Sequence, residues 1–406
     1  MTAEKHITMW AYPWDIKDEG IEKTVKFAKS DLGLTSLSVT AIYHSGKFLL
    51  PRNPRRRVYF PEPGVTYFRS NPQLYKGLKL QPLVSSLAQE EDFYPRIREA
   101  CRKEGLNFGA WVLAFHNSGL GSRYPECCQR NAYGDIYPYA LCPANPDCQE
   151  FVKTLVTDLV TNYEPYALDL ESPNYVGYFH GMHHELTPTN YGDLEVFLLS
   201  LCFCDNCRRM GEEAGIEIDK LQRWVRETLD RRLNEDWFSP EWVKKNMEDL
   251  YGLLMYKPDL MEFVRARQRV VTSIVRELKE ICHKGGAKLF TIASIFSRPS
   301  NRAWTEGTDL PQLAGLVDGL GILCYYPTPT EVFDDLRFAV SAVPDKEKLM
   351  VGLMAAMPTT SSKQVLLGQV SAAKALGISK FGFYNYGFIN DLRLPWVAEA
   401  VRLIKS

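Results

Sequence analysis

Eight short segments rich in β-branched or aromatic residues recur along the chain, and their recurrence constrains the fold more than any other feature. They lie at 6–12, 35–43, 106–114, 165–171, 287–293, 317–325, 347–354 and 379–386. Segments of helical period separate them: in 146–163, Phe151, Leu155 and Leu159 recur at every fourth position, and 361–376 has a similar spacing. Strands that alternate with helices predict a parallel sheet with helices packed outside it.

Eight strand–helix units are the number that closes a (β/α)8 barrel. We therefore predict an α/β TIM barrel that forms a single domain over residues 1–406. A doubly wound open sheet is the alternative, although no predicted strand is followed by the G-x-G-x-x-G turn typical of that fold. Two connections are long: we expect a loop excursion over 44–90 and a mostly helical insertion over 172–285. In a barrel, such connections are expected at the C-terminal mouth, where sites are built.

The composition excludes several classes of protein. Hydrophobic residues make up 45% of the chain and charged residues 24%, which is ordinary for a globular protein. The 48 Lys and Arg balance the 49 Asp and Glu, so the chain lacks the field of a nucleic-acid or anionic-membrane binder. The opening residues have no signal-peptide core, and no apolar run approaches the ~20 residues of a membrane span. We expect a cytoplasmic protein with reduced cysteines.

The most specific chemical pattern is Asp169-Leu-Glu171 at the end of the fourth predicted strand. Residues two apart on a strand share a face, so both carboxylates are expected to point into the barrel, with Glu171 nearer the mouth. Two adjacent carboxylates repel when both are ionised, so we expect one of them to hold its proton. A protonated carboxyl is what general acid catalysis needs at neutral pH, which makes Glu171 and Asp169 the candidate catalytic pair. A buried structural acidic pair is the alternative.

This pattern resembles the end of the D-x-x-D-x-D-x-E signature of family 18 glycoside hydrolases, in which the two earlier positions are Glu164 and Ala167 in this chain. The resemblance implies that Glu171 is the general acid and that Asp169 assists the acetamido group of the substrate. Residues 323–326 and 348–353 resemble the sixth and seventh strands of that family. Residues 142–175 are similar to uncharacterised glycosyl-hydrolase-like barrels, in which an N-P-x-x-x-x-F helix precedes a strand ending in L-D-x-E. These resemblances imply a carbohydrate-active barrel.

A second catalytic carboxylate is not evident at the seventh predicted strand, which ends in Met354-Ala-Ala-Met-Pro-Thr. A retaining enzyme with one Glu on strand four and another on strand seven is therefore not predicted. A hydrolase would need its second group from Asp169, Glu185, Glu306 or Asp391.

Histidine and aromatic residues follow several predicted strands, where a barrel would expose them at its mouth. Sugar rings stack on aromatic faces, and polar side chains bind the hydroxyl groups. We assign Trp111 to core packing. The candidate substrate-binding residues are Trp10, His44, His116, Asn117, His180, His183, His184, Glu185, Trp304, Tyr325, Tyr326, Asn385 and Tyr386.

The strongest metal pattern is Cys202-Phe-Cys204-Asp-Asn-Cys207, in which three thiolates within six residues are able to surround one zinc ion. Arg208 and Arg209 are candidates to offset the thiolate charge. Cys127, Cys128, Cys142 and Cys148 are candidates for a fourth ligand. The cluster resembles the C-x-C-x-x-C structural zinc site of family 42 β-galactosidases. Reduced buried thiols at the start of a helix are the alternative.

The sequence thus favours a glycoside hydrolase that acts on a carbohydrate or glycoside substrate. It needs no cofactor for its chemistry and has a structural zinc as an option. Two alternatives stay open: a barrel that binds carbohydrate without hydrolysing it, and a metal-dependent sugar lyase or isomerase that uses the His-rich loop. Trp224, Trp237 and Trp242 in the insertion suggest an interface for a homo-oligomer.

Overall fold

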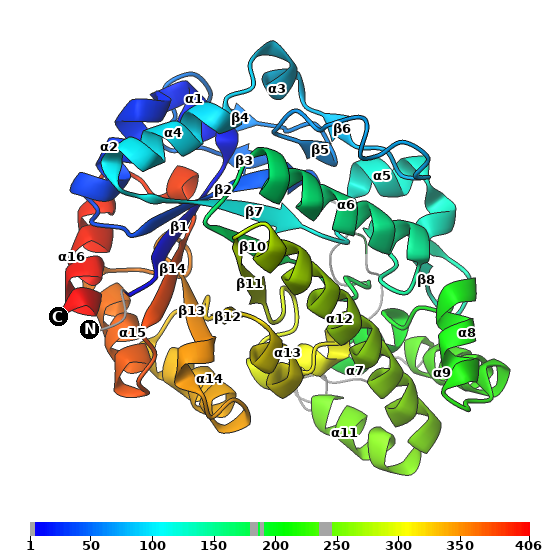
Figure 1. Cartoon of the computed structure of the whole chain (residues 1–406). Coiled ribbons are helices and arrows are strands. Elements are labelled where there is room, and N and C mark those ends of the chain that lie inside the picture. Colours follow the sequence, from blue (N-terminus) through cyan, green and yellow to red (C-terminus); the bar gives the residue numbers. More distant parts are fainter. Residues whose placement is uncertain (1–4, 179–185, 187–190, 235–245) are drawn as a thin grey trace.

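The computed structural model describes residues 5–178, 186, 191–234 and 246–406. At its centre is a closed barrel of parallel strands surrounded by helices (Figure 1). In order around the ring, its strands are β1 (Ile7–Ala11), β2 (Ser36–Tyr43), β7 (Asn107–Leu113), β10 (Ala167–Glu171), β11 (Lys288–Ile292), β12 (Gly319–Leu323), β13 (Leu349–Met354) and β14 (Lys380–Tyr384). Pairing of β14 with β1 closes the ring. The predicted α/β barrel is confirmed, and the open-sheet alternative is wrong.

Each barrel strand lies inside one of the eight predicted segments. All residues of β1 and β2 are buried, because the barrel interior covers one face of each strand and the helices cover the other. This double burial is why the segments have continuous apolar runs rather than a strict alternation. The side chains of Asp169 and Glu171 nevertheless enter the barrel from β10, whose register places Asp169 beside Trp111 of β7.

Helices follow most of the strands and cover the outside of the barrel. Helix α6 (Pro146–Asn162) begins at Asn145, whose side chain accepts hydrogen bonds from the backbone amides of Asp147 and Cys148. Its Phe151, Leu155 and Leu159 are buried, as their spacing predicts. The other outer helices are α1 (Pro13–Glu19), α2 (Ile21–Ser30), α4 (Tyr94–Glu104), α13 (Leu310–Leu316), α14 (Pro329–Ala342), α15 (Lys363–Ala375) and α16 (Leu394–Lys405).

The chain leaves the barrel after β2 and again after β7. The first excursion contains β3 (Phe48–Leu49), β4 (Val58–Tyr59), β5 (Val65–Thr66), β6 (Leu83–Val84) and α3 (Ser86–Glu90). Its β5 pairs antiparallel with the end of β2, which anchors the excursion to the barrel. The second contains α5 (Ser118–Arg123) and the antiparallel pair β8 (Cys128–Arg130) and β9 (Ile136–Leu141).

The insertion after β10 is helical over its described part. Its helices are α7 (Asp193–Leu199), α8 (Asp205–Glu213), α9 (Ile218–Leu233), α11 (Asn246–Tyr256) and α12 (Pro258–Lys284). Helix α12 returns the chain to β11 and packs against α6. Trp224 is half-buried beneath Lys257, 5.1 Å from ammonium to ring centre. Trp237 and Trp242 lie outside the described residues. No helix in the described part of the chain is long and apolar enough to cross a membrane.

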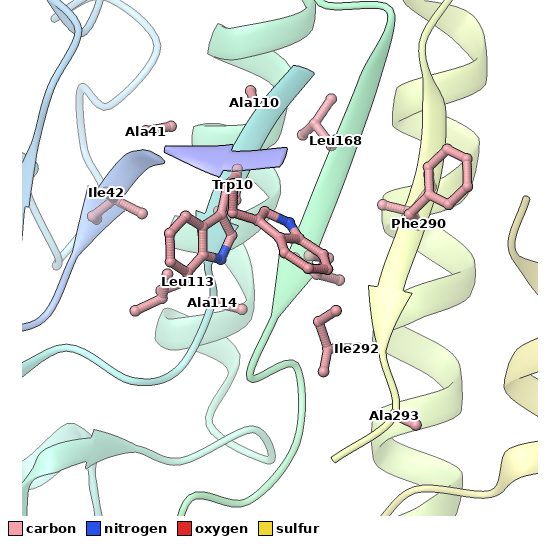
Figure 2. Close-up of a cluster of buried hydrophobic side chains, with 14 of the residues drawn as sticks. Trp10, Ala41, Ile42, Ala110, Leu113, Ala114, Leu168, Phe290, Ile292 and Ala293 are labelled. Carbon is pink, nitrogen blue, oxygen red and sulfur yellow. The ribbon is translucent and has the colours of Figure 1, made fainter. Parts of the chain in front are cut away.

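A tryptophan fills the interior of the barrel. Trp10 of β1 is almost fully buried and belongs to a cluster of buried hydrophobic side chains with Leu113 and Ile292, which come from other strands (Figure 2). A Cβ atom at Gly382 of β14 would overlap the Trp10 indole, and one at Gly352 of β13 would touch it. Glycine at these two positions therefore leaves room for the indole, which becomes a wall of the cavity above it.

Candidate functional site

A cavity of about 230 Å³ lies at the C-terminal end of the barrel strands, where catalytic sites of this fold are built. Its position follows from its lining, because most of the residues come from the last position of a strand or from the loop just beyond it. The lining residues are Trp10, Trp111, Glu171, Ile292, Ile295, Arg298, Leu323, Tyr325, Met354 and Tyr384. Among the described residues that line the cavity, Glu171 is the one carboxylate. The site is thus an aromatic and aliphatic pocket around a single acid.

Glu171 is partly accessible through the cavity. The indole N–H of Trp111 donates a 2.7 Å hydrogen bond to Glu171 Oε2 and fixes the orientation of the carboxyl. Burial raises the pKa of Glu171 to about 7, although the Trp111 hydrogen bond lowers it. Both the protonated and the ionised carboxyl are therefore accessible near neutral pH, which allows Glu171 to donate a proton and to take one back.

Asp169 lies deeper in the barrel and is buried. Burial raises the pKa of Asp169 to about 6, while hydrogen bonding to Ser38 and Trp10 lowers it. Its Oδ1 has no hydrogen-bond partner among the described residues. Neither carboxylate acts on the pKa of the other. The expected raised pKa is thus present, but its cause is desolvation by the apolar barrel and not repulsion within the pair.

Three tyrosine hydroxyl groups meet beside the cavity. Tyr12 donates to Tyr43 across 3.0 Å, and the Tyr12 and Tyr384 oxygens are 2.8 Å apart. Burial raises the pKa of each of the three phenols well above the ordinary value, and the charge of Glu171 adds to this for Tyr43 and Tyr384. The phenols therefore stay neutral, and of the three only Tyr384 also lines the cavity.

Arg298 brings a positive charge to the cavity. It follows β11, and its guanidinium lies 5.3 Å from the ring centre of Tyr325. Arg298 also lines a second cavity of about 190 Å³, together with Asp193, Phe296 and Arg302. It therefore stands at the boundary between two hollows at the mouth of the barrel.

Sequence reasoning missed several of these residues. The assignment of Trp111 to core packing is wrong in part, because this buried indole also lines the cavity and binds Glu171. The sequence alone does not show that Asp169 lies beside Trp111, because this depends on the register between β10 and β7. The sequence indicates Arg298 as a site residue only weakly, through its position as a basic residue just beyond the fifth predicted strand. Of the predicted substrate-binding residues, Trp10 and Tyr325 line the cavity.

The predicted substrate-binding residues His44 and His116 lie elsewhere at the mouth. The two imidazole rings stack with centres 3.7 Å apart, and His44 also packs against Tyr43, which belongs to the tyrosine group. His116 is buried and faces the ring of Phe296 at 6.1 Å. Because Phe296 lines the second cavity, His116 places the histidine pair beside that cavity.

Five other predicted substrate-binding residues have structural contacts outside the cavity around Glu171. Asn117 and Asn385 are buried caps that accept backbone amide hydrogen bonds from Leu120 and Gly387. Trp304 packs against Phe197 and Tyr251. The other two bind carboxylates: Tyr326 donates to Asp335, and Tyr386 donates to Glu19 beneath Arg52.

The candidates for a second carboxylate are dispersed. The buried carboxylate of Glu306 accepts hydrogen bonds from the Ser294 hydroxyl and the backbone amides of residues 295–297. It therefore stabilises the loop after β11. Asp391 lines a hollow of about 470 Å³ between α2 and α16, on the outside of the barrel. Four predicted residues, His180, His183, His184 and Glu185, lie outside the described residues.

The cysteine cluster lies away from the cavity around Glu171, beside the second excursion. The ligand atoms of Cys142, Cys202, Cys204 and Cys207 all lie within 4.8 Å of one another, and all four residues are buried. Of the candidates for a fourth ligand, the fold therefore brings Cys142 to the cluster. Among the described residues, these four cysteines are the one group of potential ligand side chains close enough together to hold a metal ion. Its ligand chemistry suits zinc.

Several solved structures of other proteins are similar to this fold. The chain is similar to the glycoside hydrolase domain of PgaB (BpsB) from Bordetella bronchiseptica, with a TM-score of 0.59, 13% identity and 98% of each chain covered. For the catalytic domain of β-amylase from Paenibacillus polymyxa, the TM-score is 0.57 at 11% identity, covering 98% of this chain and 97% of that one. For α-L-fucosidase isoenzyme 2 from Paenibacillus thiaminolyticus, the TM-score is 0.56 at 12% identity, covering 99% of this chain and 49% of that one.

No family model and no curated protein sequence matches the chain. The structural similarity, at these low identities, shows a shared fold. The chain therefore has the (β/α)8 barrel of glycoside hydrolases such as these, as the sequence resemblance implied.

Proposed function

We propose that the chain is a carbohydrate-active hydrolase in which Glu171 is the general acid and base. The observation that carries this proposal is the setting of Glu171: a carboxyl with a pKa of about 7, oriented by Trp111, in an aromatic cavity at the mouth of the barrel. Trp10, Tyr325 and Tyr384 offer faces for a sugar ring, and the tyrosine hydroxyls offer hydrogen bonds. The fold shared with glycoside hydrolases raises this expectation without fixing the reaction.

In the proposed first step, the Glu171 carboxyl gives its proton to the glycosidic oxygen as the bond from that oxygen to the anomeric carbon breaks. The leaving alcohol departs neutral, and Glu171 is left as a carboxylate. In the second step, Glu171 takes a proton from the water that attacks the anomeric carbon. The protonated carboxyl is then restored, and the net reaction adds one water across the glycosidic bond.

The positive charge that develops at the anomeric carbon needs a stabilising partner. Because the described cavity lining holds one carboxylate, we propose that the acetamido oxygen of an N-acetylated sugar attacks the anomeric carbon in the first step. Water then opens the cyclic intermediate, which returns the acetamido group unchanged. Asp169, below Glu171 on the same face of β10, is buried and does not line the cavity, so we assign it a supporting role beneath Glu171 rather than contact with the acetamido group.

The test is product release from a panel of glycosides that includes N-acetylhexosaminides, with wild type and Glu171→Gln side by side. We expect wild-type turnover that falls about 100-fold or more in the variant, with sugar binding retained by calorimetry, because Gln keeps the shape and loses the proton. Equal turnover in the two proteins would contradict the role of Glu171. Binding without wild-type turnover would favour the alternative, a barrel that binds carbohydrate without hydrolysing it.

A further inference from the structure

The four clustered cysteines have the spacing of a tetrahedral metal site. The Sγ atom of Cys142 lies 3.4 Å from that of Cys207, 3.5 Å from that of Cys204 and 4.0 Å from that of Cys202. Four sulfurs bound to one zinc ion at about 2.3 Å lie about 3.8 Å apart. All the cysteines in the described residues are free thiols, so no disulfide competes for these sulfurs. The backbone N–H of Arg130 points at Cys202 Sγ across 3.4 Å, as donors to thiolates do.

A buried arginine beside the cluster needs a negative charge. Arg267 of α12 is 0% exposed, and none of its three guanidinium nitrogens has a hydrogen-bond partner among the described residues. Its guanidinium lies 4.3 Å from the ring centre of Tyr175, whose hydroxyl is 3.8 Å from Cys207 Sγ. The groups that act electrostatically on Arg267 are Tyr175 and the sulfurs of Cys207, Cys202 and Cys142. An isolated buried cation is costly, so neutral thiols would leave Arg267 uncompensated.

The arginines expected from sequence to balance the thiolates are engaged elsewhere. Arg208 binds Asp219 and Gln222, and Arg209 binds Asn206. Arg267 lies about 60 residues further along the chain, so only the fold brings it to the cluster. Four thiolates around one divalent zinc carry a net charge of about −2, which supplies the anion that Arg267 lacks.

We propose that Cys142, Cys202, Cys204 and Cys207 bind one Zn²⁺ as thiolates and that Arg267 is the buried counter-ion of this site. Because protein sulfurs fill all four positions, the metal is structural and has no open position for a substrate. It joins the excursion carrying β9 to the insertion after β10, which it reaches at the start of α8 and, through Arg267, at α12. Tyr175, which lies between Arg267 and Cys207, also lines the second cavity, so the site would fix one wall of the mouth.

The first test is metal analysis of the purified full-length chain by mass spectrometry of the elements. We expect about one zinc per chain, and after exchange with Co²⁺ the absorption bands of a tetrahedral cobalt–thiolate site. Metal-free protein that does not take up zinc, or stoichiometric iron in place of zinc, would overturn the proposal. This measurement needs no variant, so a folding defect cannot obscure it.

The second test is the rate of zinc transfer to a coloured chelator. Cys142→Ser should release zinc at least about 10-fold faster than wild type, whereas Cys148→Ser should match wild type. Cys148 is the matched control, because it is also buried and near the cluster in sequence but outside the metal-ligand set. Equal release from the two variants would remove Cys142 from the site.

The third test isolates the counter-ion. Arg267→Met fills a similar volume without charge and should also release zinc about 10-fold faster or more, because the dianionic site loses its neighbouring cation. Arg269→Met, on the same helix and largely exposed, is the control and should release zinc at the wild-type rate. Equal rates for the two arginine variants would overturn the role of Arg267 while leaving the zinc ligands in place.

Discussion

At the residue scale, the chemistry depends on how little polar support the two carboxyls of β10 receive. Glu171 has one donor, the Trp111 indole, and Asp169 has an oxygen without a partner. Few hydrogen bonds leave desolvation as the dominant influence on both pKa values, which therefore rise toward neutrality. A richer shell of donors would hold both groups ionised and remove the acid.

Trp111→Phe tests the control of Glu171 by its neighbour. Phenylalanine keeps an aromatic wall but cannot donate to the carboxylate, so the pKa of Glu171 should rise further by about one pH unit. A general acid is active while protonated, so the alkaline limb of kcat/KM should move to higher pH by the same amount. The pH–rate profile of the variant checks this, and an unchanged or lowered alkaline limb would contradict it.

Asp169→Asn should stabilise the fold as pH rises. Between the ordinary pKa of Asp and the raised value of about 6, the native state binds more protons than the unfolded state, so stability falls with increasing pH. Asparagine avoids ionisation in the barrel interior. The variant should therefore gain about 2 kcal/mol in free energy of unfolding relative to wild type on going from about pH 4 to about pH 8. Urea unfolding at both pH values measures the gain, and the account is wrong if it is absent.

At the scale of elements, the strands and their order of alternation were predictable because hydrophobic runs and helical periods report directly on burial. Helix α6 and its buried Phe151, Leu155 and Leu159 are an example. The register between strands was not predictable, and Trp111 shows the consequence: its contact with Glu171 depends on which residue of β7 lies beside β10. The reason for glycine at positions 352 and 382 becomes clear only in three dimensions, because both residues leave room for the Trp10 indole.

Gly382→Ala tests whether β14 must leave room for Trp10. The added methyl group would overlap the indole, so we expect a loss of about 1–3 kcal/mol in stability and weaker sugar binding as Trp10 shifts into the cavity. Gly315→Ala in α13 is the matched control, because nothing lies within 4 Å of its added Cβ. That change should be neutral or slightly stabilising in a helix. Thermal unfolding measures the stability of both variants. Equal stability of the two would contradict a close contact between position 382 and Trp10.

At the scale of the whole molecule, the closed barrel places two chemically different centres in separate regions. The cavity around Glu171 is built from one carboxyl and several aromatic groups, and the cysteine cluster lies among the segments that extend from the barrel. The sequence identified Cys202, Cys204 and Cys207 because they are close along the chain. Cys142 and Arg267 come from distant segments, so their arrival at the same place was not predictable from spacing.

Chelation distinguishes the proposed hydrolase from the metal-dependent alternative based on His180, His183, His184 and Glu185. Addition of EDTA should leave initial rates within about twofold of the control, because the proposed proton transfers use Glu171 and no labile metal. Loss of activity that a divalent cation restores would instead support metal-dependent chemistry. The initial rate is the readout, so that slow loss of a structural metal does not enter the comparison.

The most direct test of the central claim, general acid catalysis by Glu171, compares two substrates with the same sugar and different leaving groups. For a poor alcohol leaving group, Glu171→Gln should lower kcat/KM by about 100-fold or more, because departure requires a proton. For an activated phenol, which leaves without protonation, the loss should be much smaller. Equal losses on both substrates would contradict a proton-donating role for Glu171.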